Sequence, residues 1–138
     1  MNVRDVMTTN PRTVGPNDTI QRAATVMKEV DTGFVPIVEN GKVVGVVTDR
    51  DIVVRAVAAG SWDKPVSEIA TRNLAFVSSS SSTRDAEKLM SERQVRRIAV
   101  VDDGQLVGIV SLGDLAVKEG KDSRTGETLE SISEGVKH

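Results

Sequence analysis

Two short segments of this sequence each place a hydroxyl side chain three residues before a carboxylate. Thr48 precedes Asp51, and Ser111 precedes Asp114. Each hydroxyl follows an apolar run, at a point where a helix is expected to begin. Free backbone N–H groups and the positive end of the helix dipole favour an anion there. A carboxylate one helical turn further on can accept two hydrogen bonds from a vicinal diol. The pattern therefore suits a ribose-phosphate.

The same residues also have a structural interpretation. Thr48 and Ser111 are favourable N-cap residues, and a cap contributes about 1 kcal/mol to stability. The two aspartates would then place negative charge in the first helical turn, where the helix dipole favours it. Capping and ligand binding do not exclude each other, so both interpretations stay open. Gly45 and Gly108, in the strands before the hydroxyls, would let backbone approach closely.

Both segments belong to a longer internal repeat with an offset of 63 residues. Residues 3–52 align with residues 66–115 without a gap, and thirteen of the fifty pairs are identical. Chance similarity rarely keeps its register over such a length. The sequence therefore indicates a duplication.

Each copy carries the signals of one series of elements, β-α-β-β-α. Helical spacing of apolar residues follows Asp18, which starts a capping-box pattern with Gln21, and it recurs from Ser82 onward. Two apolar runs joined by Asn-Gly or Asp-Gly then predict a β-hairpin in each copy. The expected elements are short strands over 12–14 and 75–77, helices over 20–30 and 82–92, hairpins over 34–47 and 98–110, and final helices over 49–58 and 113–118.

The repeat predicts two units, residues 1–60 and 66–120, joined by a linker at 61–65. Each unit alone would leave one face of its sheet uncovered, and pairing the two sheets would bury both faces. Residues 121–138 are polar. They form either a mobile tail or a weak amphipathic turn with Leu129, Ile132 and Val136.

Composition excludes several classes of function. The net charge is −2 and no basic block stands out, which argues against broad nucleic-acid binding. The chain has no Cys, and its one His is His138 at the terminus, so neither a Cys-zinc site nor a histidine base is expected. No apolar run approaches the ~18 residues of a membrane span, and the N-terminus lacks a signal-peptide pattern. We expect a cytoplasmic protein.

An enzyme is not expected either. Asp49 and Asp51 could in principle hold a metal, as in a nucleotide hydrolase. However, the sequence contains no P-loop, no His or Cys base and no dense carboxylate cluster.

The β-α-β-β-α order, the duplication and the cognate segments 45–51 and 108–114 resemble a cystathionine-β-synthase (CBS) domain pair, or Bateman module. The resemblance covers residues 1–120 and is closest to small bacterial proteins that consist of a CBS pair alone. It implies an α/β fold of two CBS units packed sheet to sheet with pseudo-two-fold symmetry. It also implies a regulatory module that binds an adenosine-containing ligand in the cleft between the units, and a homodimer. In the family, the hydroxyl contacts phosphate and the aspartate holds the ribose hydroxyls.

Further candidate ligand residues lie outside the two motifs. Arg97 aligns with apolar Phe34, and an arginine that enters a strand needs an anion or a wet cleft. For each arginine the alternative is a solvated charged face, and for each apolar candidate it is an ordinary core position. The candidate ligand residues are Thr48, Asp51, Ser111, Asp114, Arg50, Arg96, Arg97, Thr13, Val14, Pro36, Val77 and Ala99, with no metal ligand.

Two function hypotheses remain. In the first, the chain senses AMP, ADP or ATP, with S-adenosylmethionine or NAD as second choices, and signals to an unknown protein target. In the second, it is a ligand-free dimerisation or scaffold domain. A nucleotide would raise the melting temperature in the first case only. Neither hypothesis requires a cofactor.

Overall fold

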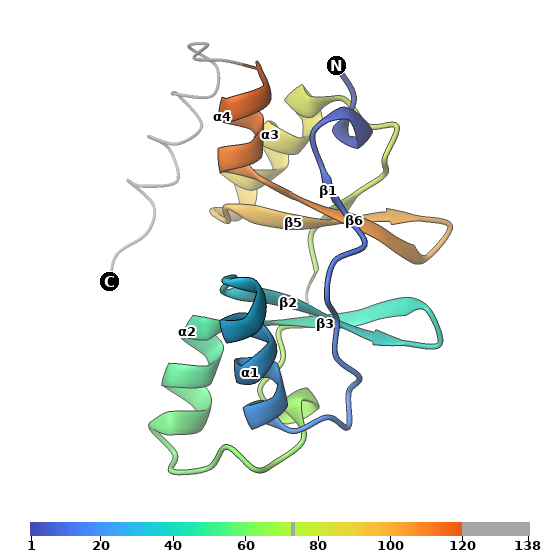
Figure 1. The fold of residues 1–138 in the computed structure, drawn as a ribbon. Coiled ribbons are helices and arrows are strands. Elements are labelled where there is room, and N and C mark those ends of the chain that lie inside the picture. The colour runs from blue at the N-terminus through green and yellow to red at the C-terminus, as the bar shows by residue number, and fades with distance from the viewer. Residues whose placement is uncertain (73, 120–138) are drawn as a thin grey trace. The chain divides into compact units, whose positions relative to one another are not determined.

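The computed structural model describes residues 1–72 and 74–119, which form two compact units (Figure 1). The first-repeat unit contains Pro11–Leu74 and Gly104–Leu106. The second-repeat unit contains Met1–Asn10, Ala75–Asp103 and residues 107–119. The predicted tail at 121–138 lies outside the described residues.

The first-repeat unit is built on an antiparallel hairpin of β2 (Phe34–Glu39) and β3 (Lys42–Thr48). Asn40 and Gly41 form its turn with φ angles of 53° and 80°, as the Asn-Gly pair predicts. In Figure 1, α1 (Ile20–Val30) and α2 (Asp49–Asp51) cover the same face of this hairpin. The remaining elements are the π-helical segment η2 (Ile52–Val57) and the 3-10 turn η3 (Val66–Glu68). The core consists of Val14, Ile20, Ala23, Val26, Met27, Val35, Ile37, Val47, Ala56, Val66 and Ile69.

The second-repeat unit has the same plan. Short β4 (Phe76–Val77) runs parallel to β5 (Arg97–Asp102), which lies beside β6 (Gln105–Ser111). The chain start supplies the 3-10 turn η1 (Val3–Asp5) and β1 (Thr8–Thr9), which pairs antiparallel with β6. In Figure 1, α3 (Thr83–Arg93) and α4 (Leu112–Glu119) lie on one face of these strands. The core consists of Val3, Val6, Val77, Ala86, Met90, Ile98, Val100, Val110, Leu112 and Leu115.

The β-α-β-β-α order and the mixed α/β class are confirmed, while local details differ from the prediction. The prediction of a capping box formed by Asp18 and Gln21 is wrong. The N-cap of α1 is Thr19, whose hydroxyl accepts from the amide of Arg22 at 3.0 Å, whereas the Asp18 carboxylate accepts from the amide of Gly15 at 2.7 Å. Of the short strand predicted over 12–14, only Val14 pairs with another residue, in an isolated parallel bridge to Ile37. The helix expected at 49–58 changes from α to π geometry after Asp51.

The segment that precedes the first strand of each repeat, its lead-in, comprises residues 3–10 in the first repeat and 66–72 in the second. Each lead-in belongs to the unit of the other repeat. Val3 and Val6, which precede the first repeat's helix, are buried in the core of the second-repeat unit. Their counterparts Val66 and Ile69 are buried in the core of the first-repeat unit. The lead-ins are therefore exchanged between the repeats. The domain boundaries that follow the sequence repeat stay a prediction.

Residues of the predicted linker pack on the start of α1. The amide of Ile20 donates to the carbonyl of Lys64 at 2.9 Å, and that of Gln21 to the carbonyl of Trp62 at 2.9 Å. Across both described ranges, every helix is too short or too polar to cross a membrane.

Candidate ligand site

The first motif lies where β3 ends and α2 begins. The Thr48 hydroxyl accepts from the amide of Asp51 at 3.1 Å, and the Asp51 carboxylate accepts from the amide of Thr48 at 2.9 Å. This reciprocal pair is a capping box that satisfies two free amides. It also holds the carboxylate in one orientation, with Asp51 only 8% exposed.

The second motif repeats this geometry. The Ser111 hydroxyl accepts from the amide of Asp114 at 3.0 Å, and the Asp114 carboxylate accepts from the amide of Ser111 at 3.1 Å. The N-cap interpretation of Thr48 and Ser111 is thus confirmed, whereas the bonds from the Asp51 and Asp114 carboxylates back to the cap amides were not predicted. The motifs keep chemical capacity beyond the cap, since a hydroxyl that accepts one bond still has a proton to donate. Each carboxylate likewise has a second oxygen.

Two residues join Asp51 that were not predicted to contact it. The Thr71 hydroxyl donates to Asp51 Oδ2 at 3.5 Å, and Arg55 Nε lies 4.0 Å from Asp51 Oδ1. Arg55 also donates to the carbonyl of Ile69 at 3.1 Å. The sequence signal at Thr71 is its identity with Thr8 in the repeat, which does not indicate a contact with Asp51.

The two motif glycines each admit a neighbouring lead-in segment. A Cβ on Gly45 would lie 3.3 Å from the carbonyl oxygen of Thr71, and one on Gly108 would lie 2.8 Å from that of Thr8. Thr71 pairs with Val46, and Thr8 with Ile109. The predicted close approach of backbone is confirmed, and the approaching backbone is the chain's own.

The candidate arginines are solvated. The side chains of Arg50, Arg96 and Arg97 are all exposed. Arg97 is the first residue of β5, and its exposed side chain has the contact with water that an arginine in a strand needs. The backbone of Arg96 contributes to the second motif, since its carbonyl accepts from the amide of Leu112 at 2.8 Å.

The candidate adenine contacts divide into core and surface positions. Val14, Pro36, Val77 and Ala99 are buried, and Val14 and Val77 belong to the two hydrophobic cores. Thr13 is exposed. The alternative of ordinary core positions is thus borne out for Val14 and Val77, and a role in ligand binding stays a prediction for all five.

Comparison with known proteins identifies the family. The model of the CBS domain matches residues 3–57 and again residues 66–118. The chain belongs to the CBS domain family. The CBS domain-containing protein YhcV of Bacillus subtilis is 46% identical over 132 residues, which cover 95% of this chain and 94% of the relative. The expected resemblance to small CBS-pair proteins is confirmed.

Two similar solved structures are CBS proteins that hold adenosyl ligands. The CBS pair of protein MJ0100, in complex with 5'-methylthioadenosine and S-adenosyl-L-methionine, has a TM-score of 0.79 and 31% identity, covering 87% of this chain and 96% of that one. CBSX2 in complex with AMP has a TM-score of 0.76 and 28% identity, covering 86% of this chain and 95% of that one.

The described part of this CBS pair does not bring three or more His, Cys, Asp or Glu side chains together in a way that could hold a metal ion.

Proposed function

We propose that this CBS pair is a regulatory module that binds an adenine nucleotide through its two hydroxyl–carboxylate motifs. The observation that carries the proposal is the duplicated capping box, which orients a carboxylate and a hydroxyl identically in both repeats. Such preorganisation lowers the entropy cost of binding. The predicted cleft between the repeats stays a prediction.

Each motif offers complementary groups to a ribose-phosphate. The Asp oxygens accept from the vicinal ribose hydroxyls, while the hydroxyl of Thr48 or Ser111 donates its remaining proton to a phosphate oxygen. Arg97, which is exposed and cationic, is the candidate partner for the phosphate charge. The adenosyl ligands of MJ0100 and CBSX2 support this class of ligand.

The candidate ligands are AMP, ADP and ATP as first choices, and S-adenosylmethionine and NAD as second choices. We favour a phosphate-bearing ligand over S-adenosylmethionine because the motif hydroxyls and the exposed arginines supply donors and positive charge for a phosphate. NAD also carries phosphates and stays a second choice. The role that follows is regulatory rather than enzymatic. The ligand would shift the populations of two conformations by its different affinity for them, and a protein target would respond to the change.

A thermal-shift screen of the full chain with AMP, ADP, ATP, S-adenosylmethionine, NAD and GMP tests the proposal. A ligand at 100 times its Kd adds about 2.7 kcal/mol to stability, which raises Tm by several degrees. We expect such an increase with at least one adenine nucleotide. An equal increase with GMP would show that the motifs recognise the ribose-phosphate and not the adenine base.

Two variants locate the binding. Asp114→Asn and Asp51→Asn keep an oxygen for the amide of the cap but remove the charge that receives the ribose hydroxyls. Asp103→Asn is the matched control, because Asp103 has a φ of 50° in a turn where Asn fits equally well. The nucleotide shift should fall in one or both motif variants and stay unchanged in the control. Identical shifts in all three variants would contradict the assignment of the site.

We also propose that the protein is a homodimer through the η2 segment. Val53, Val54 and Val57 are 60%, 54% and 52% exposed, and Trp62 nearby in sequence is 52% exposed. Apolar side chains gathered on one short helix mark an interaction surface. A second copy would bury this surface twice in one symmetric contact.

Analytical ultracentrifugation tests the dimer. The double variant Val53→Glu/Val57→Glu should be monomeric at concentrations at which the wild type is dimeric. Val30→Glu, which also adds an acid at an exposed apolar position, should leave the dimer intact. A monomeric wild type, or a dimeric double variant, would show that this face does not mediate association.

A further inference from the structure

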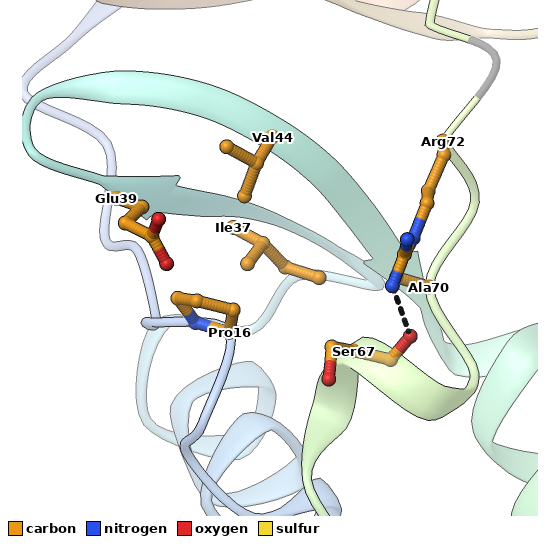
Figure 2. A pocket seen from close by; sticks show the side chains of 7 residues that line it. All are labelled: Pro16, Ile37, Glu39, Val44, Ser67, Ala70 and Arg72. Carbon is orange, nitrogen blue, oxygen red and sulfur yellow. Dashed lines mark hydrogen bonds between the residues drawn. The ribbon is translucent and has the colours of Figure 1, made fainter.

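A cavity of about 180 Å³ lies in the first-repeat unit at the hairpin end of β2 and β3 (Figure 2). Pro16, Ile37, Val44 and Ala70 supply its apolar wall. Pockets for drug-sized ligands measure ~300–1,000 Å³, so an occupant of this cavity is smaller than a nucleotide. The cavity is distinct from the capping-box motif, which lies at the other end of β3.

A β-bulge contributes to the wall of the cavity. Ile37 pairs with Gly45 and Val38 with Val43, which leaves Val44 as the extra residue on β3. Bulges of this kind redirect a side chain and are frequent beside functional sites. In Figure 2, Val44 points toward Ile37 across the cavity.

Two opposite charges flank the apolar wall. Glu39 and Arg72 lie on opposite sides of Ile37 in Figure 2. One Arg72 nitrogen donates to the carbonyl of Ser67 at 3.2 Å, which orients the guanidinium and leaves it further N–H donors. Among the described residues, the Glu39 carboxylate has no hydrogen-bonding or ion-pair partner. The charges thus suit a ligand with a cation and an anion of its own.

In the second repeat, the equivalent carboxylate accepts its hydrogen bonds from a residue of the same repeat. Asp102 aligns with Glu39, and Ser79 aligns with Pro16. The Ser79 hydroxyl donates to Asp102 Oδ2 at 2.6 Å and its amide to Oδ1 at 3.0 Å, and these bonds lower the pKa of Asp102. Pro16 has neither a hydroxyl nor an N–H, so it can make neither bond to Glu39.

The space beside the carboxylate also differs between the repeats. Ala70 aligns with Met7. Met7 packs against the core of its unit, and its sulfur lies 2.8 Å from where a Cβ on Gly108 would stand. The first repeat therefore has a small side chain and an unpaired carboxylate where the second has a large side chain and a paired one.

We propose that this cavity binds a free aliphatic α-amino acid. The branched side chain packs on Ile37, Val44 and Ala70. The ammonium group pairs with Glu39, and the carboxylate accepts hydrogen bonds from Arg72. Both charges are required, so a residue within a peptide chain does not satisfy the site. This site is independent of the proposed nucleotide motifs, and the two ligands bind separately.

Isothermal titration calorimetry of the full chain with L-leucine as the probe tests the proposal. We expect saturable binding to the wild type. Leucinamide lacks the carboxylate and 4-methylpentanoate lacks the ammonium group. Each should bind roughly tenfold to a hundredfold more weakly, because each leaves one charged group of the site unpaired.

Two variants and one control place the binding in the cavity. Ala70→Met fills the space as Met7 does in the other repeat and should abolish leucine binding. Glu39→Gln, at an exposed position, should weaken it without unfolding the chain. Glu68→Gln, which is exposed on η3 outside the cavity, should bind leucine as the wild type does.

The absence of saturable leucine binding to the wild type would overturn the proposal, as would equal binding by the wild type and Glu39→Gln. AMP titrated into the same samples reports the nucleotide motifs separately. In the wild type, AMP binding without leucine binding refutes only the cavity, and leucine binding without AMP binding refutes only the nucleotide site.

Discussion

At the scale of single residues, the motif aspartates have a structural role in the helix cap and a proposed second role in ligand binding. Each accepts from the amide at the helix start through one oxygen, and each has a second oxygen that this bond does not use. The sequence predicted the N-cap hydroxyls, and the Thr-x-x-Asp and Ser-x-x-Asp spacing also permits the reciprocal bond from the carboxylate. The role of the aspartates as ribose acceptors stays a prediction. The sequence did not predict that Thr71 joins Asp51, since that contact joins residues twenty positions apart.

The cap at Ser111 can be separated from the rest of the motif by substitution. Ser111→Ala removes the acceptor for the amide of Asp114 and should lower the free energy of unfolding by about 1 kcal/mol. Ser111→Thr reproduces the arrangement at Thr48 and should retain both stability and nucleotide affinity. Urea unfolding monitored by circular dichroism measures the difference. Equal stability of Ser111→Ala and the wild type would contradict the cap.

Asp102 makes stability depend on pH. The hydroxyl and amide of Ser79 lower its pKa in the folded chain below the ordinary value of 3.8. The stabilisation is therefore complete above pH ~4 and is lost as the pH falls through the folded-state pKa. Ser79→Ala should show a smaller loss of stability between pH ~4 and ~2 than the wild type. Ser80→Ala, at an exposed neighbouring position, is the control. Parallel pH profiles of Ser79→Ala and the wild type would refute this origin.

At the scale of elements, prediction succeeded where the signals are local. Both hairpins follow from Asn-Gly or Asp-Gly between apolar runs, and α3 (Thr83–Arg93) lies within one residue of the helix predicted at 82–92. The N-cap of α1 was misplaced by one residue because Asp18 and Thr19 are both good caps, and the contact of Asp18 with Gly15 decides between them. The π geometry of η2 has no signal in the sequence that we can identify.

The two motif glycines provide a matched test of how closely the lead-ins approach the strands. A Cβ on Gly108 would lie 2.8 Å from the backbone oxygen of Thr8 and displace β1, so Gly108→Ala should cost about 1–3 kcal/mol. At Gly45 the nearest atom lies at 3.3 Å. Gly45→Ala should be nearly neutral, because the lower entropy of the unfolded chain offsets mild crowding. Chemical denaturation measures both, and equal losses would contradict the difference in spacing.

At the scale of the whole molecule, the duplication was evident from the sequence but the exchange of lead-ins was not. Register over fifty positions reveals the repeat. Whether Val3 and Val6 are buried in the first-repeat or the second-repeat unit depends on long-range packing. The periodicity of apolar residues does not indicate which unit it is. The cavity at Glu39 was also missed, because it combines residues from the loop before α1, the hairpin and the second lead-in.

Deletion of residues 1–10 should destabilise only the second-repeat unit. It removes Val3 and Val6 from that core and β1 from β6. Hydrogen–deuterium exchange should therefore show faster exchange in α3 and unchanged protection in α1. Loss of protection in α1 with α3 intact would mean that the lead-in serves its own repeat.

The most direct test of the nucleotide proposal is a crystal structure of the full chain with AMP. The account predicts ribose hydroxyls within hydrogen-bonding distance of the carboxylate of Asp51 or Asp114, with the Thr48 or Ser111 hydroxyl directed at the phosphate. AMP held at a place where it contacts neither aspartate would contradict it.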